Sequence, residues 1–280
     1  MATGARFVAY AGNLEDVLLW RALRDVEAGF WIDVGAYAPV NGSTTRAFSE
    51  RGWRGINIEP NPALFDRFPA ARPRDVNLNV AAGAADGELT FHVAQRTGLS
   101  TLDAAQARRL SDDGIATVPQ VVPVRSLDSI WEAHVPPDQP VHFLKIDVEG
   151  YEASVVAGND WERHRPWIAV IEATRPLTTE PSHEAWEGPL LAARYDLAHE
   201  DGLNRFYVAR EHAELLPALR LPPNVFDAFV THHELRAIER AARLEAQVAA
   251  MRASASWRLT RPLRAVGRVA HRLSRRLPRG

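Results

Sequence analysis

The chain has 280 residues, no cysteine and a formal net charge of -2, with 46% hydrophobic and 24% charged residues. This composition is typical of a soluble globular protein with one large domain and a remainder, and it excludes wholesale disorder. The lack of cysteine excludes disulfides, thiolate metal sites and a cysteine nucleophile. No apolar run approaches the roughly 20 residues that span a bilayer, and residues 1–10 do not resemble a secretory signal, so we expect a cytoplasmic protein.

The net charge is unevenly distributed along the chain. Residues 246–280 contain nine arginines and no acidic residue, so a charge of +9 there leaves -11 for the first 245 residues. An acidic body argues against a nucleic-acid surface spread over the fold. The basic end predicts an anionic partner for that segment alone.

The predicted elements begin with an amphipathic helix within residues 6–24, for which Asn13 is a candidate N-cap with Asp16 three residues later. The apolar run Phe30–Val34 then predicts a buried parallel strand. This strand carries Asp33 near its end and is followed by Gly35 and Ala36, then by a helix at residues 42–50. Strand, glycine turn and helix in this order are typical of a nucleotide-binding βα unit.

A second strand, at residues 54–59, ends in Glu59 about 25 residues after Asp33. In dinucleotide-binding folds an acidic residue at this spacing accepts hydrogen bonds from a ribose diol. A purely structural interpretation remains open, in which Asp33 and Glu59 cap the helices that follow them. Pro60, Asn61 and Pro62 break the chain before a helix at residues 63–68.

The middle of the chain continues with strands at residues 75–82, 88–94 and 121–125 and helices at residues 106–110 and 127–131. The strand at 88–94 alternates apolar and polar residues, which predicts one buried face and an edge position. The apolar run 141–147 ends in Asp147, with Glu149 and Glu152 just beyond it, and the strand at 167–171 is closed by Glu172. Because ligands bind at the carboxyl ends of parallel strands, we expect these acids to converge with Asp33 and Glu59.

A helix at residues 184–193, strands at 195–199 and 203–209, and a closing segment at 215–229 complete a single doubly wound α/β domain. We expect this domain to cover residues 1–230. We expect residues 231–253 to form a helical linker with a short coiled-coil pattern. Residues 254–280 are expected to form a basic amphipathic tail. The tail suits an anionic membrane surface through residues 257–279, but packing on the body is also open and nucleic acid is least favoured.

Several separate motifs, in order, resemble the FkbM family of S-adenosylmethionine-dependent methyltransferases over residues 10–208. They are Asn13–Val17, Trp31–Ala36, Gly52–Pro62, Asn77–Ala82, Leu99–Leu102, Val122–Arg125 and above all Phe143–Glu152. The resemblance implies a Rossmann-like, doubly wound, mostly parallel sheet of the class I methyltransferase type. It also implies O-methylation, commonly of a sugar hydroxyl, and the tail looks like the appendages of bacterial cell-surface polysaccharide enzymes.

With that cofactor, the resemblance implies a role for each strand end. Asp33 would hold the amino group of the cofactor, Gly35 and Ala36 would let the backbone pass its methionine end, and Glu59 would take the ribose hydroxyls. The further residues expected to bind the cofactor are Asn61, Asn79, Ala81 and Asp147. Because the sulfonium is cationic, an acidic pocket favours its binding.

Methyl transfer needs the acceptor oxygen, the methyl group and the sulfur to be aligned, and it needs a group that accepts the hydroxyl proton. We expect the catalytic residues to be Asp147, Glu149 and Glu172. By likeness to metal-using sugar O-methyltransferases, Asp147 and Glu172 would bind Mg²⁺ and Glu149 would be the base. Metal-free catalysis by Glu149, His142 or His183 stays open, and Lys145, the only lysine, either pairs with an acid or snorkels.

We therefore expect a sugar O-methyltransferase at the cytoplasmic membrane face that acts on a sugar, glycan or lipid-linked glycan in polysaccharide or glycolipid biosynthesis. The alternative is a non-catalytic adaptor with the same fold in a glycan-assembly complex. Such an adaptor would have lost a carboxylate at a strand end, and none is missing here. The sequence leaves open whether the chain forms a homo-oligomer.

Overall fold

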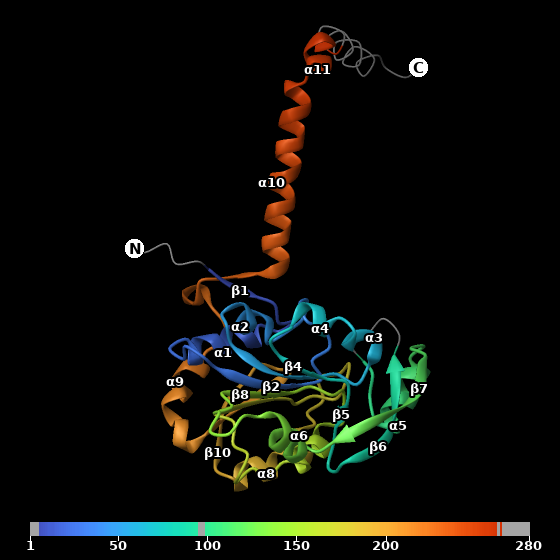
Figure 1. Cartoon of the computed structure of the whole chain (residues 1–280), viewed down its shortest axis with the longest axis vertical. Helices are drawn as coiled ribbons and strands as arrows, with labels where there is room; N and C mark the ends of the chain where they lie inside the picture. Colours follow the sequence, from blue (N-terminus) through green and yellow to red (C-terminus); the bar gives the residue numbers. More distant parts are fainter. Residues whose placement is uncertain (1–5, 95–98, 262–263, 265–280) are drawn as a thin grey trace, which may run out of the picture. The chain divides into compact units, whose positions relative to one another are not determined.

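The computed structural model describes residues 6–94, 99–261 and 264 (Figure 1). The chain divides into two compact units, Met1–Phe229 and Val230–Gly280. The first unit has an α/β fold with a mixed central sheet and a smaller second sheet.

The central sheet has seven strands in the order β10-β11-β9-β8-β2-β3-β4. Their bounds are β2 Phe30–Val34, β3 Arg54–Ile58, β4 Val76–Leu78, β8 Phe143–Ile146, β9 Ile168–Glu172, β10 Tyr195–Glu200 and β11 Asn204–Ala209. Five neighbouring strands of this sheet are parallel to one another: β4, β3, β2, β8 and β9. Strand β11 runs antiparallel to both of its neighbours, β9 and β10. Every residue of β2, β8 and β9 is buried, as expected for parallel strands covered on both faces.

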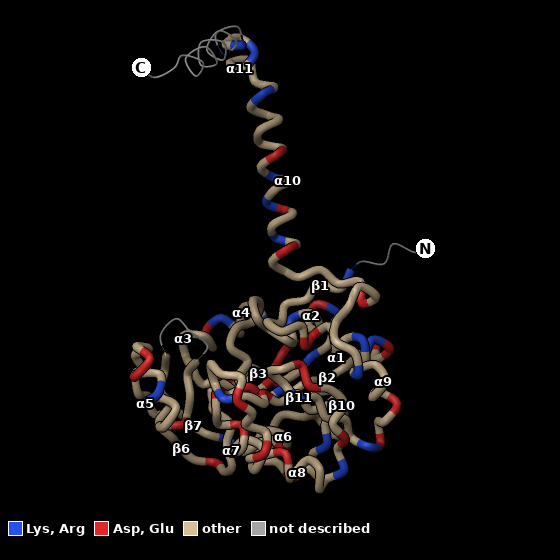
Figure 2. The backbone as a smooth tube through the Cα atoms, turned by 180° about the vertical axis from the view of Figure 1, so that it is seen from behind, with Lys and Arg blue, Asp and Glu red and all other residues tan. Residues whose placement is uncertain are grey.

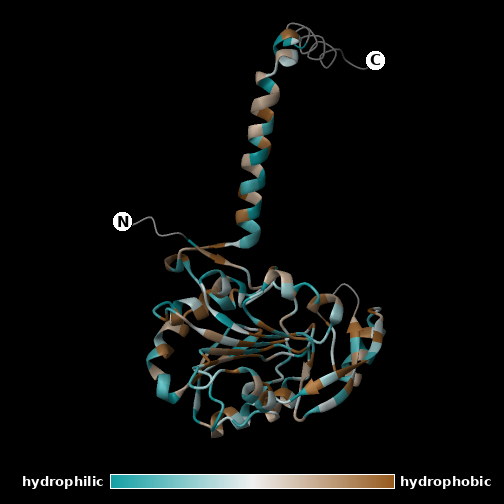
Figure 3. Ribbon diagram, in the orientation of Figure 1, coloured by the Kyte–Doolittle hydropathy of each residue, from teal (hydrophilic) through white to brown (hydrophobic). Residues whose placement is uncertain are grey.

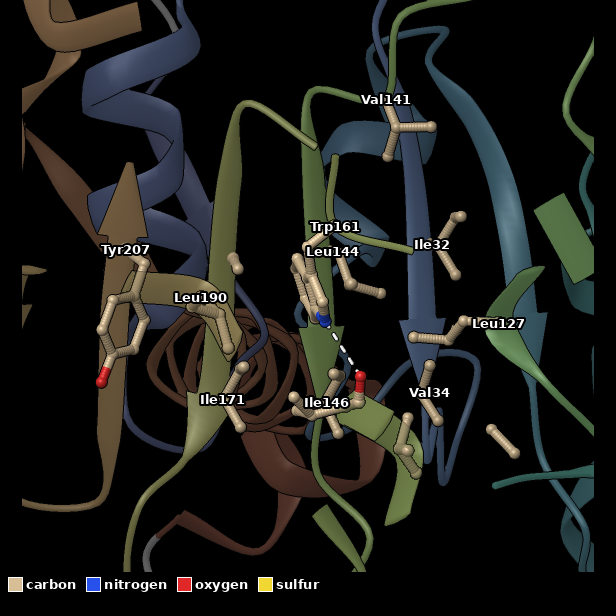
Figure 4. Packing of buried hydrophobic residues seen from close by; sticks show 14 of the residues in the cluster. Ile32, Val34, Leu127, Val141, Leu144, Ile146, Trp161, Ile171, Leu190 and Tyr207 are labelled. Carbon is tan, nitrogen blue, oxygen red and sulfur yellow. Dashed lines mark hydrogen bonds between the residues drawn. The ribbon is translucent and has the colours of Figure 1, made fainter. Parts of the chain in front are cut away.

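Helices cover both faces of this sheet, because successive side chains of each strand point to opposite sides (Figure 1). On one face Ile32 and Leu144 pack with residues of α6 (Leu127–His134), α7 (Glu152–Ala157) and α8 (Glu187–Ala192). In this cluster the indole Nε1 of Trp161 donates to the Val156 carbonyl at 2.9 Å (Figure 4).

On the other face Trp31 and Phe143 pack with residues of α1 (Glu15–Leu23), α2 (Arg46–Glu50) and α9 (Leu216–Leu219). Figure 3 shows hydrophobic segments gathered in the strands between these layers. The shorter elements of this unit are β1 Phe7–Ala9, α3 Pro62–Phe65, α4 Phe68–Ala71, η1 His183–Ala185, η2 Arg210–Leu215 and η3 Val225–Asp227.

Several predicted elements differ in detail from the observed ones. The helix expected within residues 6–24 is α1, but β1 precedes it, and its N-cap position is Leu14, not Asn13, and makes no side-chain cap. The helix expected at residues 63–68 is divided into α3 and α4. Residues 75–82 form two strands: after β4 the chain leaves the central sheet, and β5 (Ala81–Ala82) pairs with β7 instead. At the break, Asn79 Nδ2 donates to the carbonyls of Glu59 and Pro60 at 2.8 and 3.2 Å.

The second sheet has the order β5-β7-β6 and is accompanied by α5 (Ala104–Asp112). Strand β6 (Gly87–Ala94) is the outer strand of this sheet and pairs with β7 (Thr117–Arg125), which confirms the predicted edge position. Phe91 on β6 is buried, whereas Leu89 is 40% exposed. The predicted strand at 121–125 is the second half of the longer β7.

The second unit begins within β12 (Phe229–Thr231) and contains α10 (His232–Ala253) and α11 (Ala255–Leu259). Thr231 and Ser254 cap these helices through their hydroxyl groups. Figure 2 shows basic and acidic residues following one another along α10. Most of the predicted basic tail, residues 262–263 and 265–280, lies outside the described residues. None of the helices that the structure describes is long and apolar enough to cross a bilayer.

Candidate functional site

A cavity of about 210 Å³ opens at the carboxyl ends of β2, β3 and β8. Of the eight residues predicted to bind a cofactor, six line it: Asp33, Gly35, Ala36, Glu59, Ala81 and Asp147. Of the three predicted catalytic residues, Asp147 and Glu149 line it and Glu172 does not. The structure therefore brings together side chains from residues 33 to 149 along one edge of the sheet, as the strand-end argument predicts.

Asp33 is buried at the end of β2 and has an unused acceptor. Its Oδ2 accepts a hydrogen bond from Thr45 Oγ1 at 3.4 Å, whereas Oδ1 has no partner among the described residues. Burial raises the pKa of Asp33, and the positive charges of Lys145 and Arg72 oppose that rise. A buried carboxylate oxygen without a partner is costly, so a cationic or hydrogen-bond donor ligand would be favoured here.

Arg72 fixes the loop that follows β2. The guanidinium is buried and donates to the Pro39 carbonyl at 2.9 Å, to Ser43 Oγ at 2.8 Å and to Thr45 Oγ1 at 3.1 Å. Because Thr45 in turn donates to Asp33, this loop and the acid are held in one network. Gly42 and Thr44 of the same loop line the cavity.

Gly35 is required where β2 and β8 end side by side. Its φ is +79°, and a Cβ there would lie 1.8 Å from the Asp147 carbonyl oxygen. The amides of Gly35 and Ala36 both donate to the Ile58 carbonyl at 3.0 Å. A side chain at residue 35 would therefore separate the strand ends that form the cavity.

Glu59 is a buried acid that accepts two backbone hydrogen bonds. The amides of Tyr37 and Asn61 donate to its two carboxylate oxygens, each at 2.8 Å. Burial raises the pKa of Glu59 to about 7, although these two hydrogen bonds by themselves lower it. Since a carboxylate offers about four lone-pair sites, Glu59 can still accept hydrogen bonds from a ligand in the cavity.

Asn61 and Asn79, both predicted to bind the cofactor, do not line this cavity. Asn61 Oδ1 caps α3 by accepting from the Ala63 amide at 3.1 Å. Asn79 Nδ2 donates its hydrogens to the Glu59 and Pro60 carbonyls. Both side chains thus support the backbone around Glu59.

Lys145, for which the sequence leaves a choice between pairing with an acid and snorkelling, lies close to Asp147 and Asp33. Its Nζ donates to Asp147 Oδ2 at 2.7 Å, and the side chain is buried, so it pairs with an acid and does not snorkel. Burial alone would lower the pKa of Lys145, but Asp147 and Asp33 outweigh burial and raise it. A single lysine inside a buried strand, two residues before an acid, is the sequence signal that indicates this pair.

Glu149 lies in a turn between β8 and α7 and lines the cavity. Its backbone is left-handed, with φ 56°. Burial, and then the negative charge of Asp147, raise the pKa of Glu149 to about 8. A carboxylate with a pKa near neutrality is suited to accept a proton from a bound hydroxyl group.

Glu172 is buried at the end of β9 and does not line the cavity. Burial and the neighbouring carboxylates of Asp147 and Glu149 raise the pKa of Glu172 to about 10. No group of three or more histidine and acidic side chains in the described parts of the chain is arranged to hold a metal ion. With Asp147 paired to Lys145 and Glu172 outside the lining, these residues do not fit the expected Mg²⁺ site.

The histidines considered as alternative bases also lie outside the cavity lining. His142 precedes β8, at the opposite end of that strand from Asp147, where its Nδ1 accepts from the Phe30 amide at 3.1 Å. Burial lowers the pKa of His142 to about 4. His183 belongs to η1. Within the cavity, Glu149 and Asp147 remain the candidate proton acceptors.

A family model described as the methyltransferase FkbM domain matches residues 33–210. Among solved structures, a TehB-like SAM-dependent methyltransferase from Corynebacterium glutamicum ATCC 13032 Kitasato is similar at 10% identity and a TM-score of 0.37, over 70% of this chain and 87% of that chain. No curated protein matches the sequence at a significant level. The family match spans every strand end that lines the cavity.

Proposed function

Because the chain belongs to the FkbM methyltransferase family, we propose that it is an S-adenosylmethionine-dependent O-methyltransferase that acts on a sugar hydroxyl. We place its first unit in the Rossmann-like class I group of methyltransferases. The order β4-β3-β2-β8-β9-β11-β10, with β11 antiparallel to both neighbours, supports that placement. The cofactor cavity would then be the one at the ends of β2, β3 and β8.

The observation that carries the proposal is the unpartnered Oδ1 of Asp33 in the wall of this cavity. Asp33 would receive the ammonium group of the cofactor there, and Lys145 helps to keep Asp33 ionised. Glu59 would accept hydrogen bonds from the ribose hydroxyls while it holds the Tyr37 and Asn61 amides. Ala81 and Phe91 give the cavity an apolar side, which suits the adenine ring.

When bound, S-adenosylmethionine supplies a methyl group already activated by the sulfonium. The protein must then align the acceptor hydroxyl and take up its proton. Glu149 would accept this proton at its carboxylate, and Asp147, held by Lys145, would keep the negative field beside the cationic donor. No step in this scheme uses Mg²⁺, since the residues expected to bind it do not form a suitable site.

The sugar acceptor and a role in polysaccharide or glycolipid biosynthesis rest on the family resemblance. We place the enzyme at the cytoplasmic membrane face, because residues 257–279 combine an apolar stripe with arginines in the sequence. A non-catalytic adaptor has less support, since Asp33, Glu59, Asp147 and Glu149 are all present in the cavity wall.

The function can be tested by incubating the protein with methyl-labelled S-adenosylmethionine and a panel of free sugars and nucleotide sugars. We expect label in a sugar product, and a loss on the order of 100-fold or more in kcat for Glu149→Gln. Glu132→Gln is the matched control, because Glu132 is an exposed acid paired with Arg163 away from the cavity. Transfer of label to protein or nucleic acid but to no sugar would refute the proposed acceptor class.

A further inference from the structure

The left-handed backbone of Glu149 needs support from its surroundings. A non-glycine residue in this region is strained, so it persists only where neighbouring contacts fix it. The amides on either side, those of Val148 and Gly150, both donate to Glu152 Oε1 at 3.1 Å. These two bonds hold the flanks of the turn but leave the carbonyl of Glu149 itself unfixed.

That carbonyl accepts a hydrogen bond from a residue 48 positions earlier. Thr101 Oγ1 donates to the Glu149 carbonyl oxygen at 2.9 Å. The bond links the segment after β6 to the turn after β8. Ser100 and Leu102, on either side of Thr101, line the same cavity as Glu149.

Thr101 is fixed by hydrogen bonds of both its backbone and its side chain. It is fully buried, and its backbone exchanges two hydrogen bonds with His92 of β6, at 2.8 and 3.2 Å. Its Oγ1 also accepts from the Asp103 amide at 3.0 Å. Because that amide supplies a hydrogen to the oxygen, the hydroxyl hydrogen is left to point at Glu149.

We propose that Thr101 is a positioning residue for methyl transfer: its hydroxyl fixes the Glu149 peptide so that the carboxylate stays directed into the cavity. This inference rests on the proposed function, in which Glu149 takes up the acceptor proton. Thr101 touches neither substrate nor cofactor in this role. The segment that follows β6 and bonds to it thereby contributes to catalysis, while Ala81 and Phe91 of the second sheet line one side of the cavity.

The test compares Thr101→Val, which keeps the shape of the side chain but removes the hydroxyl, with Thr101→Ser, which keeps the hydroxyl. Thr178→Val is the matched control. Thr178 Oγ1 also donates to a carbonyl, that of Arg175 at 3.0 Å, and accepts from the Glu180 amide at 3.1 Å, but in an exposed loop. Three quantities are measured: kcat and KM with labelled S-adenosylmethionine and nucleotide sugars, calorimetric affinity for S-adenosylhomocysteine, and amide hydrogen exchange at Gly150.

We expect Thr101→Val to lower kcat on the order of tenfold or more, with KM for S-adenosylmethionine and affinity for S-adenosylhomocysteine within about twofold of wild type. Exchange at Gly150 should accelerate in Thr101→Val alone, and Thr101→Ser and Thr178→Val should keep wild-type kcat. An unchanged kcat in Thr101→Val, or an equal loss in Thr101→Ser, would overturn the positioning role.

The exchange measurement separates this inference from the proposed function. If wild type transfers no methyl group, the proposed function fails, and exchange at Gly150 still decides whether Thr101 fixes the turn. If wild type is active and Thr101→Val exchanges at the wild-type rate, the positioning role fails while the proposed function stands.

Discussion

Gly35 tests whether the junction of two strand ends is needed for the site. Gly35→Ala adds a Cβ 1.8 Å from the Asp147 carbonyl oxygen at a φ of +79°. Gly114→Ala is a matched control, because Gly114 has a φ of +83° and a Cβ added to it would meet nothing within 4 Å. We expect the control to lose only the about 1–2 kcal/mol of left-handed strain.

Gly35→Ala should lose more stability than that and should also lose measurable binding of S-adenosylhomocysteine, since the strand ends must separate. Urea denaturation and calorimetry on both variants give the comparison. Equal losses of stability with cofactor binding retained in both would show that residue 35 needs only backbone freedom and that the close contact is unimportant.

Lys145 is the residue whose charge holds the acidic centre together. In Lys145→Met, Asp147 loses a partner at 2.7 Å, and Asp33 loses a positive charge that opposes the rise in its pKa. Asp33 is buried, but the Asp147 side chain is 31% exposed, so we expect a loss of about 1–3 kcal/mol in the free energy of unfolding, less than for a fully buried pair.

The matched control for Lys145 is Arg163→Met. Arg163 pairs with Glu132 at 2.6 Å, but both side chains are more than half exposed, at 64% and 52%. An exposed pair is worth about 0–1 kcal/mol, so this variant should stay near wild type in urea denaturation. If the two variants lose the same stability, the buried acids do not depend on Lys145.

At the scale of elements, the sequence was informative where strands are apolar runs that end in an acid. Asp33, Glu59 and Asp147 were predicted to converge, and all three line one cavity. Buried parallel strands are mostly apolar, so an apolar run that ends in an acid is visible in the sequence.

Other features depend on partners that are distant in the sequence. Ala81 pairs with Val124 of β7, which separates β5 from β4, and no local pattern in residues 75–82 reveals that partner. Thr101 donates a single hydrogen bond to the Glu149 carbonyl, and one such bond produces no periodic pattern in the sequence. Glu172 was grouped with the cavity acids because it ends a strand, but it does not line the cavity.

The C-terminal segment carries a prediction at the element scale that rests on sequence alone. If residues 257–279 bind an anionic membrane surface, removing residues 254–280 should abolish co-sedimentation with vesicles containing about 30% phosphatidylserine. A variant with Arg268, Arg272, Arg275 and Arg276 changed to Gln should show an intermediate loss that is sensitive to salt. Equal sedimentation of the full-length and truncated chains would contradict the membrane assignment.

At the scale of the whole molecule, buried acids should make stability depend on pH. Burial raises the pKa values of Asp16, Glu59 and Glu152 to about 7 and that of Glu149 to about 8. These folded-state values exceed the about 4 of unfolded acids, so the folded chain holds more protons as pH rises toward 8. Their contribution to stability is complete below about pH 4 and is lost as pH rises through 7 to 8.

We therefore expect the free energy of unfolding, measured by urea denaturation without cofactor, to fall as pH rises from about pH 6.5 and to level off once pH passes the folded-state pKa values of about 7 to 8; the slope is up to about 1.4 kcal/mol per group and pH unit below those values. His142, whose pKa is lowered, acts in the opposite direction but below this range. Stability that rises over the same range would show that these acids are ionised in the folded chain at neutral pH.

If the acids at the ends of β2 and β3 bind the methyl donor, calorimetric titration with S-adenosylhomocysteine at about pH 8 should show one site per chain. Its affinity should fall on the order of tenfold or more in Asp33→Asn and in Glu59→Gln, and should stay unchanged in the exposed control Glu132→Gln. Wild type that takes up no S-adenosylhomocysteine, or binding that survives both substitutions undiminished, would show that these acids do not form the cofactor site.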